Sequence, residues 1–140
     1  MNAIAENFAE DEVLYPSLVK RVQSIFIDTM LIIIAMVIIS AVLNNINGTP
    51  DWVRVALFVF LFGVYEPTFI AFTNGTIGNR LMGLQVKQFN VEGKRLNIIQ
   101  SYVRFIAKLL LGWLSFLTVH ANAQKRAMHD MVCNSVMTQK

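Results

Sequence analysis

Long blocks of apolar residues, separated by polar segments, dominate the chain. The first block runs from Val22 to Leu43, and Asp28 is its only charge. The second runs from Val55 to Phe72, and Glu66 is its only charge. A membrane-spanning helix needs about 20 mostly apolar residues, and neither block carries the polar stripe of a soluble amphipathic helix. We therefore predict two transmembrane helices rather than a soluble bundle with an apolar core.

Local signals set the boundaries of these two helices. The first is expected from Leu18 to about Leu43, with Ser17 as its N-cap. The polar stretch "NNINGTPD" combines Asn, Gly and Pro and therefore predicts a turn. The second helix is expected to begin near Trp52, a residue suited to anchor a membrane interface, and to end near Phe72.

A third apolar block, Ile98 to Val119, is ambiguous because it contains Arg104 and Lys108. Together with Gln100 these residues are spaced four apart and form a polar stripe on one helix face. Gly112 offers a bend within the remaining apolar run. The block either spans the membrane once or is an amphipathic or re-entrant element. We favour the second alternative, which keeps the C-terminal tail in the cytoplasm.

The polar segment between the second and third blocks predicts a small β-structure. "LQVKQFN" alternates apolar and polar residues, as a short strand does, and "VEGKRL" supplies a glycine turn. A small cytoplasmic β-hairpin is expected here, although "MVCNSVM" near the C-terminus is a second candidate to pair with the strand that begins at Leu84. The expected fold class is thus an all-α membrane protein with two transmembrane helices, a third membrane-embedded helical element (spanning or re-entrant and amphipathic) and this β-element.

Composition and charge fit this organisation. Hydrophobic residues make up 55% of the 140 residues, and the net charge of +3 is too small to suggest nucleic acid as a partner. Residues 1–14 are expected to form an acidic, flexible tail rather than a secretory signal, and 15–140 a single membrane domain. The partners expected are the lipid bilayer and a second copy or another membrane protein, because so few helices enclose little space.

Lysine and arginine predict the orientation. The turn at 44–51 has none, whereas the loop at 73–97 contains several, and Lys20 and Arg21 precede the first helix. The positive-inside rule then places the N-terminus and the 73–97 loop in the cytoplasm. Arg54, near the outer end of the second helix, is an exception.

Charged residues on three successive segments are expected at one depth in the membrane. At 1.5 Å per residue, Asp28, Glu66 and Arg104 each lie roughly 9 Å from the cytoplasmic face. Charges in the apolar layer are costly and usually pair inside a bundle. One hypothesis is a buried ion cluster that fixes helix packing, and the other is a cation or proton site at the carboxylates, with Lys108 as a further candidate.

The chain resembles the RDD family of small membrane proteins. The likeness rests on "YPSLVKRVQSIFIDTMLI", "GTIGNRLMGLQVKQFNVEGKRLNIIQSYVRFI" and "AQKRAMHDMV". The arginine and two aspartates that name the family match Arg21, Asp28 and Asp130. Its glycine-rich loop matches a set of residues that includes Gly75, Gly78, Arg80 and Gly83. The usual lysine of that loop is Asn79 here, and the usual small-residue and threonine pair after the last aspartate is Asn134 and Ser135.

The resemblance implies a protein of the bacterial cytoplasmic (inner) membrane, in a family often suggested to transport unknown ligands. Transport of a cation, a proton or another small ligand is one expectation. The other is a non-transporting scaffold that recruits a partner through its cytoplasmic loop and tail. We expect no enzyme activity, no cofactor and no metal site, since no Ser–His–Asp arrangement or metal-binding spacing is visible. Asp130 is expected to pair with Arg21 or Arg126, or to handle protons with His129.

Overall fold

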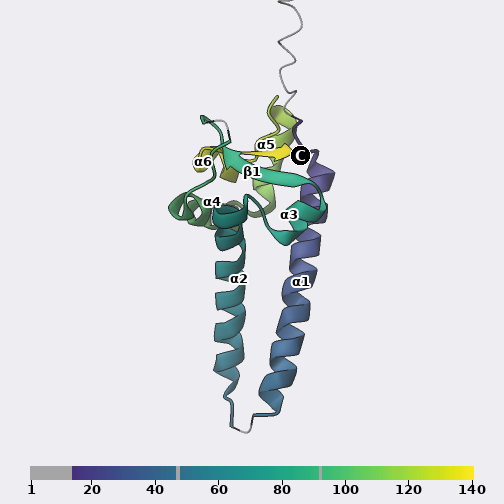
Figure 1. Cartoon of the computed structure of the whole chain (residues 1–140), viewed down its shortest axis with the longest axis vertical. Coiled ribbons are helices and arrows are strands. Elements are labelled where there is room, and N and C mark those ends of the chain that lie inside the picture. The colour runs from purple at the N-terminus through teal and green to yellow at the C-terminus, as the bar shows by residue number, and fades with distance from the viewer. Residues whose placement is uncertain (1–13, 47, 92) are drawn as a thin grey trace, which may run out of the picture.

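The computed structural model describes residues 14–46, 48–91 and 93–140. Two long helices, α1 (Leu18–Asn44) and α2 (Asp51–Thr73), run side by side and form a stem (Figure 1). Their bounds agree closely with the predicted ones. Ser17 is the N-cap of α1, as expected, and its side chain accepts a hydrogen bond from the backbone N–H of Lys20. The predicted flexible tail falls almost entirely on residues 1–13, which lie outside the described residues.

The described residues that follow α2 form a head at one end of this stem (Figure 1). It contains the helices α3 (Ile77–Leu81), α4 (Ile98–Leu111), α5 (Leu117–Ala121) and α6 (Met128–Val132), with the 3-10 helix η1 (Gly112–Phe116) between α4 and α5. Two strands, β1 (Leu84–Gln88) and β2 (Ser135–Gln139), pair antiparallel. The head therefore joins segments that are some fifty residues apart in the sequence.

The predicted β-hairpin is wrong in its second strand. β1 begins at Leu84 as expected, but it pairs with β2 from the C-terminal tail, in a register that sets Val86 opposite Met137. The segment after Gly93 is too short to form a strand, because Asn97 already caps α4. A single backbone hydrogen bond, from Gln88 N–H to the Lys94 carbonyl, links it to β1. The C-terminal alternative left open by the sequence is the one that forms.

The third apolar block is divided rather than continuous. α4 ends at Gly112, whose φ of +53° lies in the left-handed region, and the chain continues as η1 and α5. Within the part of the chain that the structure describes, three helical stretches, the last being Ile98–Ala121, are long and apolar enough to cross a membrane by length and composition. α4 runs across the end of the stem, however, and not along it (Figure 1).

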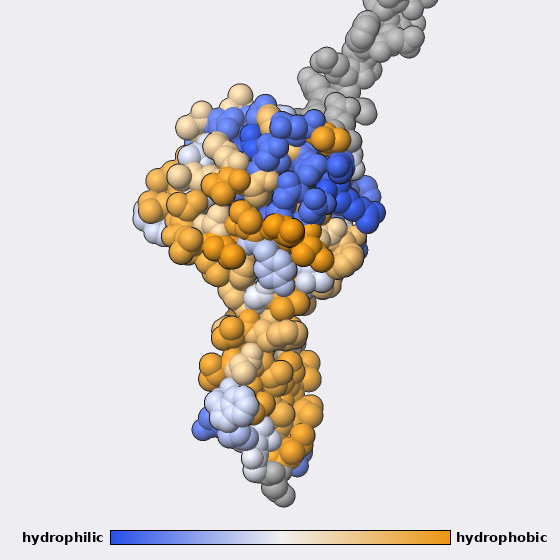
Figure 2. Space-filling model, turned by 90° about the vertical axis from the view of Figure 1, so that its left-hand side faces the viewer, coloured by the Kyte–Doolittle hydropathy of each residue, from blue (hydrophilic) through white to orange (hydrophobic). Residues whose placement is uncertain are grey.

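The apolar core of the head lies beneath the sheet. Its members are fully or almost fully buried and come from α2, both strands and the segments beside them: Ile70, Leu84, Val86, Leu96, Cys133 and Met137. The stem is different, since most of its large apolar side chains are exposed. Figure 2 shows apolar residues covering the stem and the lower part of the head, while hydrophilic residues gather above them.

Candidate functional site

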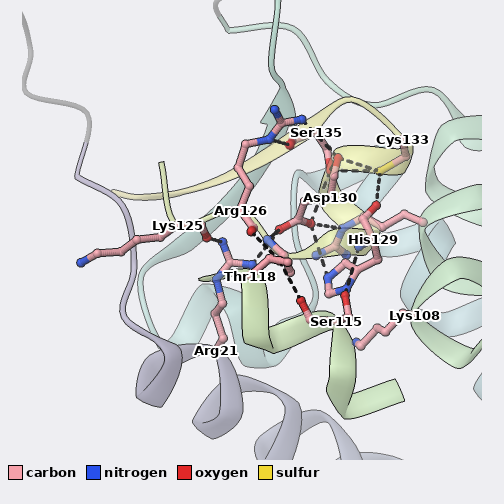
Figure 3. Close-up of polar contacts among 12 residues, drawn as sticks. Arg21, Lys108, Ser115, Thr118, Lys125, Arg126, His129, Asp130, Cys133 and Ser135 are labelled. Carbon is pink, nitrogen blue, oxygen red and sulfur yellow. Dashed lines mark hydrogen bonds and ion pairs between the residues drawn. The ribbon is translucent and has the colours of Figure 1, made fainter. Parts of the chain in front are cut away.

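Asp130, on α6, is paired with two arginines, Arg21 and Arg104, and Figure 3 shows Arg21 pointing toward it. Its Oδ2 atom accepts a hydrogen bond from Arg21 Nη1 at 2.7 Å, and its Oδ1 atom accepts one from Arg104 Nε at 2.9 Å. The three side chains are at most 3% exposed. The expected pairing of Asp130 with Arg21 is therefore present, and Arg104 is a second partner that the sequence did not indicate.

The ion pairs continue from Arg104 to the stem. Arg104 Nη1 lies 3.3 Å from Glu66 Oε1, and Lys108 Nζ donates to both Glu66 oxygens at 2.9 Å. The resulting network, Arg21–Asp130–Arg104–Glu66–Lys108, connects α1, α6, α4 and α2. Each buried charge has a partner of opposite sign, which offsets the cost of removing it from water. Glu66 and Arg104, which counting along the helices placed at one depth, are in contact.

The surroundings of Asp130 favour its charged form. Burial alone would raise the pKa of this carboxyl, but the positive charges of Arg104 and Arg21 outweigh it and hold the pKa well below its usual range. Its Oδ2 atom also accepts a hydrogen bond from the backbone N–H of Ala127, at the start of α6. Asp130 is therefore an ionised acceptor that organises the head.

A Ser–His–Asp arrangement, which the sequence did not reveal, adjoins this network. Ser115 Oγ accepts the backbone N–H of His129 at 3.0 Å and lies 2.5 Å from His129 Nδ1. The opposite ring atom, Nε2, faces the Asp130 carboxylate at 3.5 Å, which favours a proton on Nε2 and a hydrogen bond from the Ser115 hydroxyl to Nδ1. Burial lowers the pKa of His129 to about 3, in agreement with a neutral ring. Ser115 and His129 are at most 1% exposed, so this contact joins η1 to α6 and offers no surface to a substrate.

Asp28, on α1, is held in a different way. It accepts hydrogen bonds from the hydroxyl groups of Tyr65 (2.8 Å) and Thr76 and from the backbone N–H of Gly78 (2.8 Å). Each hydroxyl oxygen itself accepts a backbone N–H, from Ile77 and Asn79 respectively, so each directs its proton to Asp28. The Asp28 carboxyl group is thus an acceptor for every group that bonds it among the described residues.

The expected cluster of Asp28 with Arg104 does not form as a direct pair. Glu66 and Asp130 take both ends of the Arg104 guanidinium, whereas Asp28 faces the loop that follows α2. Counting residues along each helix gave similar depths, but it could not show which side of α1 meets α4. Tyr65 and Thr76 were missed for the same reason, although Thr76 stands at a visible helix start and caps α3.

The glycine-rich loop is explained by its close approach to α1. A Cβ atom on Gly78 would lie 2.2 Å from the backbone oxygen of Ser24 and 2.8 Å from the carboxyl carbon of Asp28. Asn79 is buried beside it, and its side-chain oxygen accepts a hydrogen bond from Ser24 Oγ at 2.8 Å. α3 is thus fastened to α1 by Gly78, Asn79 and the three bonds to Asp28.

The other loop residues singled out in the sequence have simpler surroundings. Gly75 is buried, and a Cβ there would lie 3.1 Å from the Cβ of Asn79. Gly83 has a φ of +68° and ends the turn between α3 and β1. Arg80 is exposed, and one of its nitrogens lies 3.4 Å from the carbonyl oxygen of Thr73. Arg80 is the member of this loop that remains free to contact lipid or protein.

Two cavities separate Asp28 from the ion-pair network. The smaller, about 20 Å³, is lined by side chains that include Asp28, Arg21, Arg104 and Glu66, and it is large enough for one water molecule. Arg21 Nε is buried beside it and has no hydrogen-bond partner among the described residues. A water molecule in this cavity would satisfy that donor and link Asp28 to the network.

The larger cavity is a cleft of about 250 Å³ between α1, α2 and α4. Its walls are mostly apolar side chains, namely Ile25, Ile32, Phe62, Phe105, Leu109 and Phe116. Asp28, Glu66 and Lys108 supply its charges, and Tyr65 and Thr76 its hydroxyl groups. Apolar walls with a few convergent polar groups are typical of small-ligand sites. Within the described residues, no group of three or more His, Cys, Asp or Glu side chains is placed to hold a metal ion.

Comparison with known families agrees with this geometry. The family model of the RDD family matches residues 15–134. This chain belongs to the RDD family, which is a family of membrane proteins. Arg21 and Asp130, which the sequence resemblance matched to two of the residues that name the family, are direct partners in the head, while Asp28 fastens the glycine loop to α1. No curated protein and no solved structure gives a significant match to the chain.

Proposed function

We propose that this RDD protein binds a small cation or a proton at Asp28 and takes part in ion-coupled transport across the membrane. The observation that carries the proposal is the contrast among its buried carboxylates. Glu66 and Asp130 are each bonded directly to cationic side chains, whereas Asp28 receives bonds only from neutral groups and lines the cleft. Intramembrane ionisable groups often mark ion or proton pathways.

The charge balance gives Asp28 influence over the rest of the network. Three cationic side chains and two carboxylates form the Arg21–Asp130–Arg104–Glu66–Lys108 network, so one positive charge is in excess. An Asp28 carboxylate would balance it across the water-sized cavity. A proton or cation at Asp28 removes that balance and weakens the electrostatic attraction on Lys108, which lines the same cleft and whose side chain is 22% exposed. Binding at the cleft is therefore coupled to the Lys108–Glu66 pair.

A flux measurement in proteoliposomes tests this function. The wild-type protein, with a sodium or potassium gradient and an internal pH-sensitive dye, is expected to give ion-driven pH changes above those of empty liposomes. Asp28→Asn, which keeps one of the two acceptor oxygens but removes the charge, is expected to abolish them. The matched control is Asp51→Asn, because the Asp51 side chain is 97% exposed. Flux that is unaltered in Asp28→Asn, or absent from the wild-type protein, would overturn the proposal.

The proposed setting is the bacterial inner membrane, with the N-terminus and the 73–97 loop in the cytoplasm. Every lysine and arginine of the sequence except Arg54 belongs to the head or to the residues that lead into it. Arg54 is at the far end of the stem, where its side chain bonds Asn44 and Asp51. This asymmetry supports a cytoplasmic head. The exposed apolar side chains of α1 and α2 support contact with lipid and with a second copy or another membrane protein.

The second candidate is a non-transporting scaffold that recruits a partner through the loop and tail. The exposed side chain of Arg80 supports it, whereas Asp130 is 0% exposed and would not contact a partner directly. Co-purification of one stoichiometric partner from native membranes, lost in Arg80→Ala but kept in Asp28→Asn, is the result expected of a scaffold. Retention of that partner by Arg80→Ala would count against recruitment through this residue.

A further inference from the structure

We propose that α4 and η1 lie flat within the cytoplasmic leaflet, in contact with lipid, and that the chain crosses the bilayer only at α1 and α2. The lipid bilayer itself therefore covers the exposed apolar face of α4. This proposal concerns how the protein sits in the membrane and does not depend on transport by Asp28.

The sheet supplies the first argument. β1 precedes the Ile98–Ala121 stretch, β2 follows it, and the two strands pair along their whole length. Both ends of the stretch are therefore held in the same head. A helix that crossed the bilayer once would leave its ends on opposite sides, separated by about 30 Å of hydrocarbon. The stretch must enter and leave the membrane on one side, and Gly112 supplies the break that this path needs.

The length of α2 supplies the second argument, because it sets the depth of α4. α4 is fastened to the stem at Glu66, which lies fifteen residues, or about 22 Å, from the first residue of α2. A hydrocarbon layer of about 30 Å that begins at Asp51 extends about 7 to 8 Å beyond Glu66. α4 therefore lies inside the apolar layer but close to its edge.

The side chains of α4 and η1 fit that depth. Those that face away from the ion-pair network are apolar, and several are among the most exposed in the molecule: Ile99 is 76% exposed, Leu110 82% and Trp113 73%. The opposite face carries Arg104 and Lys108, which are paired inside the protein. This apolar surface is continuous with that of the stem in Figure 2, and a surface of this size is unfavourable in water.

Fluorescence quenching of Trp113 tests the depth. The chain has two tryptophans, so Trp52→Phe leaves Trp113 as the only reporter. The full-length variant is reconstituted into vesicles whose lipids carry bromine either near the glycerol or near the terminal methyl of the acyl chain. Stronger quenching by the shallow bromines is expected. A single span of Ile98–Ala121 would put Trp113 within about 5 Å of the bilayer centre and would reverse the order.

Trp113→Phe calibrates this measurement, because it leaves only Trp52, at the far end of α2 and hence near the opposite interface. It should also be quenched more by the shallow bromines. Quenching of Trp113 mainly by the deep bromines would overturn the proposal, and so would the absence of quenching, which would place the helix in water.

Thiol labelling tests the path of the chain independently. Cys133 is only 5% exposed and bonded to its neighbours, so it is a poor reporter. In a Cys133→Ala background, Lys94→Cys in the loop and Lys140→Cys at the tail are both at exposed positions, and Asp51→Cys marks the opposite end of the stem. A membrane-impermeant maleimide should label the first two cysteines from the same side of the membrane and the third cysteine from the opposite side. Labelling of Lys94→Cys and Lys140→Cys from opposite sides would refute the flat arrangement.

Discussion

The regions around the two signature aspartates use the same chemical group in opposite ways. Asp130 is fully buried between two arginines, and its charge is needed to hold α1, α4 and α6 together. Asp28 is bonded by two hydroxyl groups and one backbone N–H, and it borders a cleft. Direct ion pairing closes the first site to other ligands. Neutral donors orient the second carboxyl group, which is the group we propose to bind a cation or proton.

The largest expected effect comes from removing the charge of Asp130. Asp130→Asn leaves Arg21 and Arg104 buried without their shared carboxylate, and breaking a buried pair in this way costs about 3–5 kcal/mol in free energy of unfolding. Denaturation in detergent, followed by circular dichroism, measures the loss. Asp51→Asn is the control, and its exposed side chain predicts a change within about 0.5 kcal/mol. Equal changes in the two variants would contradict a structural role for Asp130.

A smaller loss is expected where α3 meets α1. Gly78→Ala places a methyl group 2.2 Å from the Ser24 backbone oxygen, so the loop must move away from Asp28, at a cost of about 1–3 kcal/mol. Gly63→Ala, in the middle of α2, is the matched control because its added methyl group would have no atom within 4 Å. The same denaturation assay compares them. A Gly78→Ala protein as stable as Gly63→Ala would show that the loop is not tightly fastened to α1.

The third effect expected is a pH dependence, which spreads over several pH units and begins with His129, beside Asp130. His129 is neutral in the folded protein, with a pKa of about 3, and near 6.5 once unfolded. Between these values the unfolded state binds the extra proton, so stability falls as the pH is lowered, by up to about 1.4 kcal/mol per pH unit. Asp130 adds to the loss only below its unfolded pKa, near 4.

Unfolding between pH 7 and 5 in His129→Gln separates the two contributions. The slope in this range should disappear in that variant and persist in His120→Gln, whose histidine is exposed. A slope that survives in His129→Gln would assign the acid sensitivity to another group.

The sequence determined what depends on local order and composition. The apolar blocks fixed the bounds of α1 and α2, because chain length and hydropathy decide where a membrane helix begins and ends. Counting residues from the head end of each helix placed Glu66 and Arg104 at the same depth, and the structure has these two side chains in contact. The break at Gly112 was also visible, since glycine tolerates the left-handed backbone found there.

Only the tertiary structure decided which partners meet. The pairing of β1 with β2, the separation of Asp28 from Arg104 and the Ser115–His129–Asp130 contact all join residues that no local pattern connects. Their choice depends on the rotation of each helix about its own axis and on the path of the chain after α4. Periodicity gives the faces of a helix, but it does not say which face meets which neighbour, because that is settled by packing over the whole head.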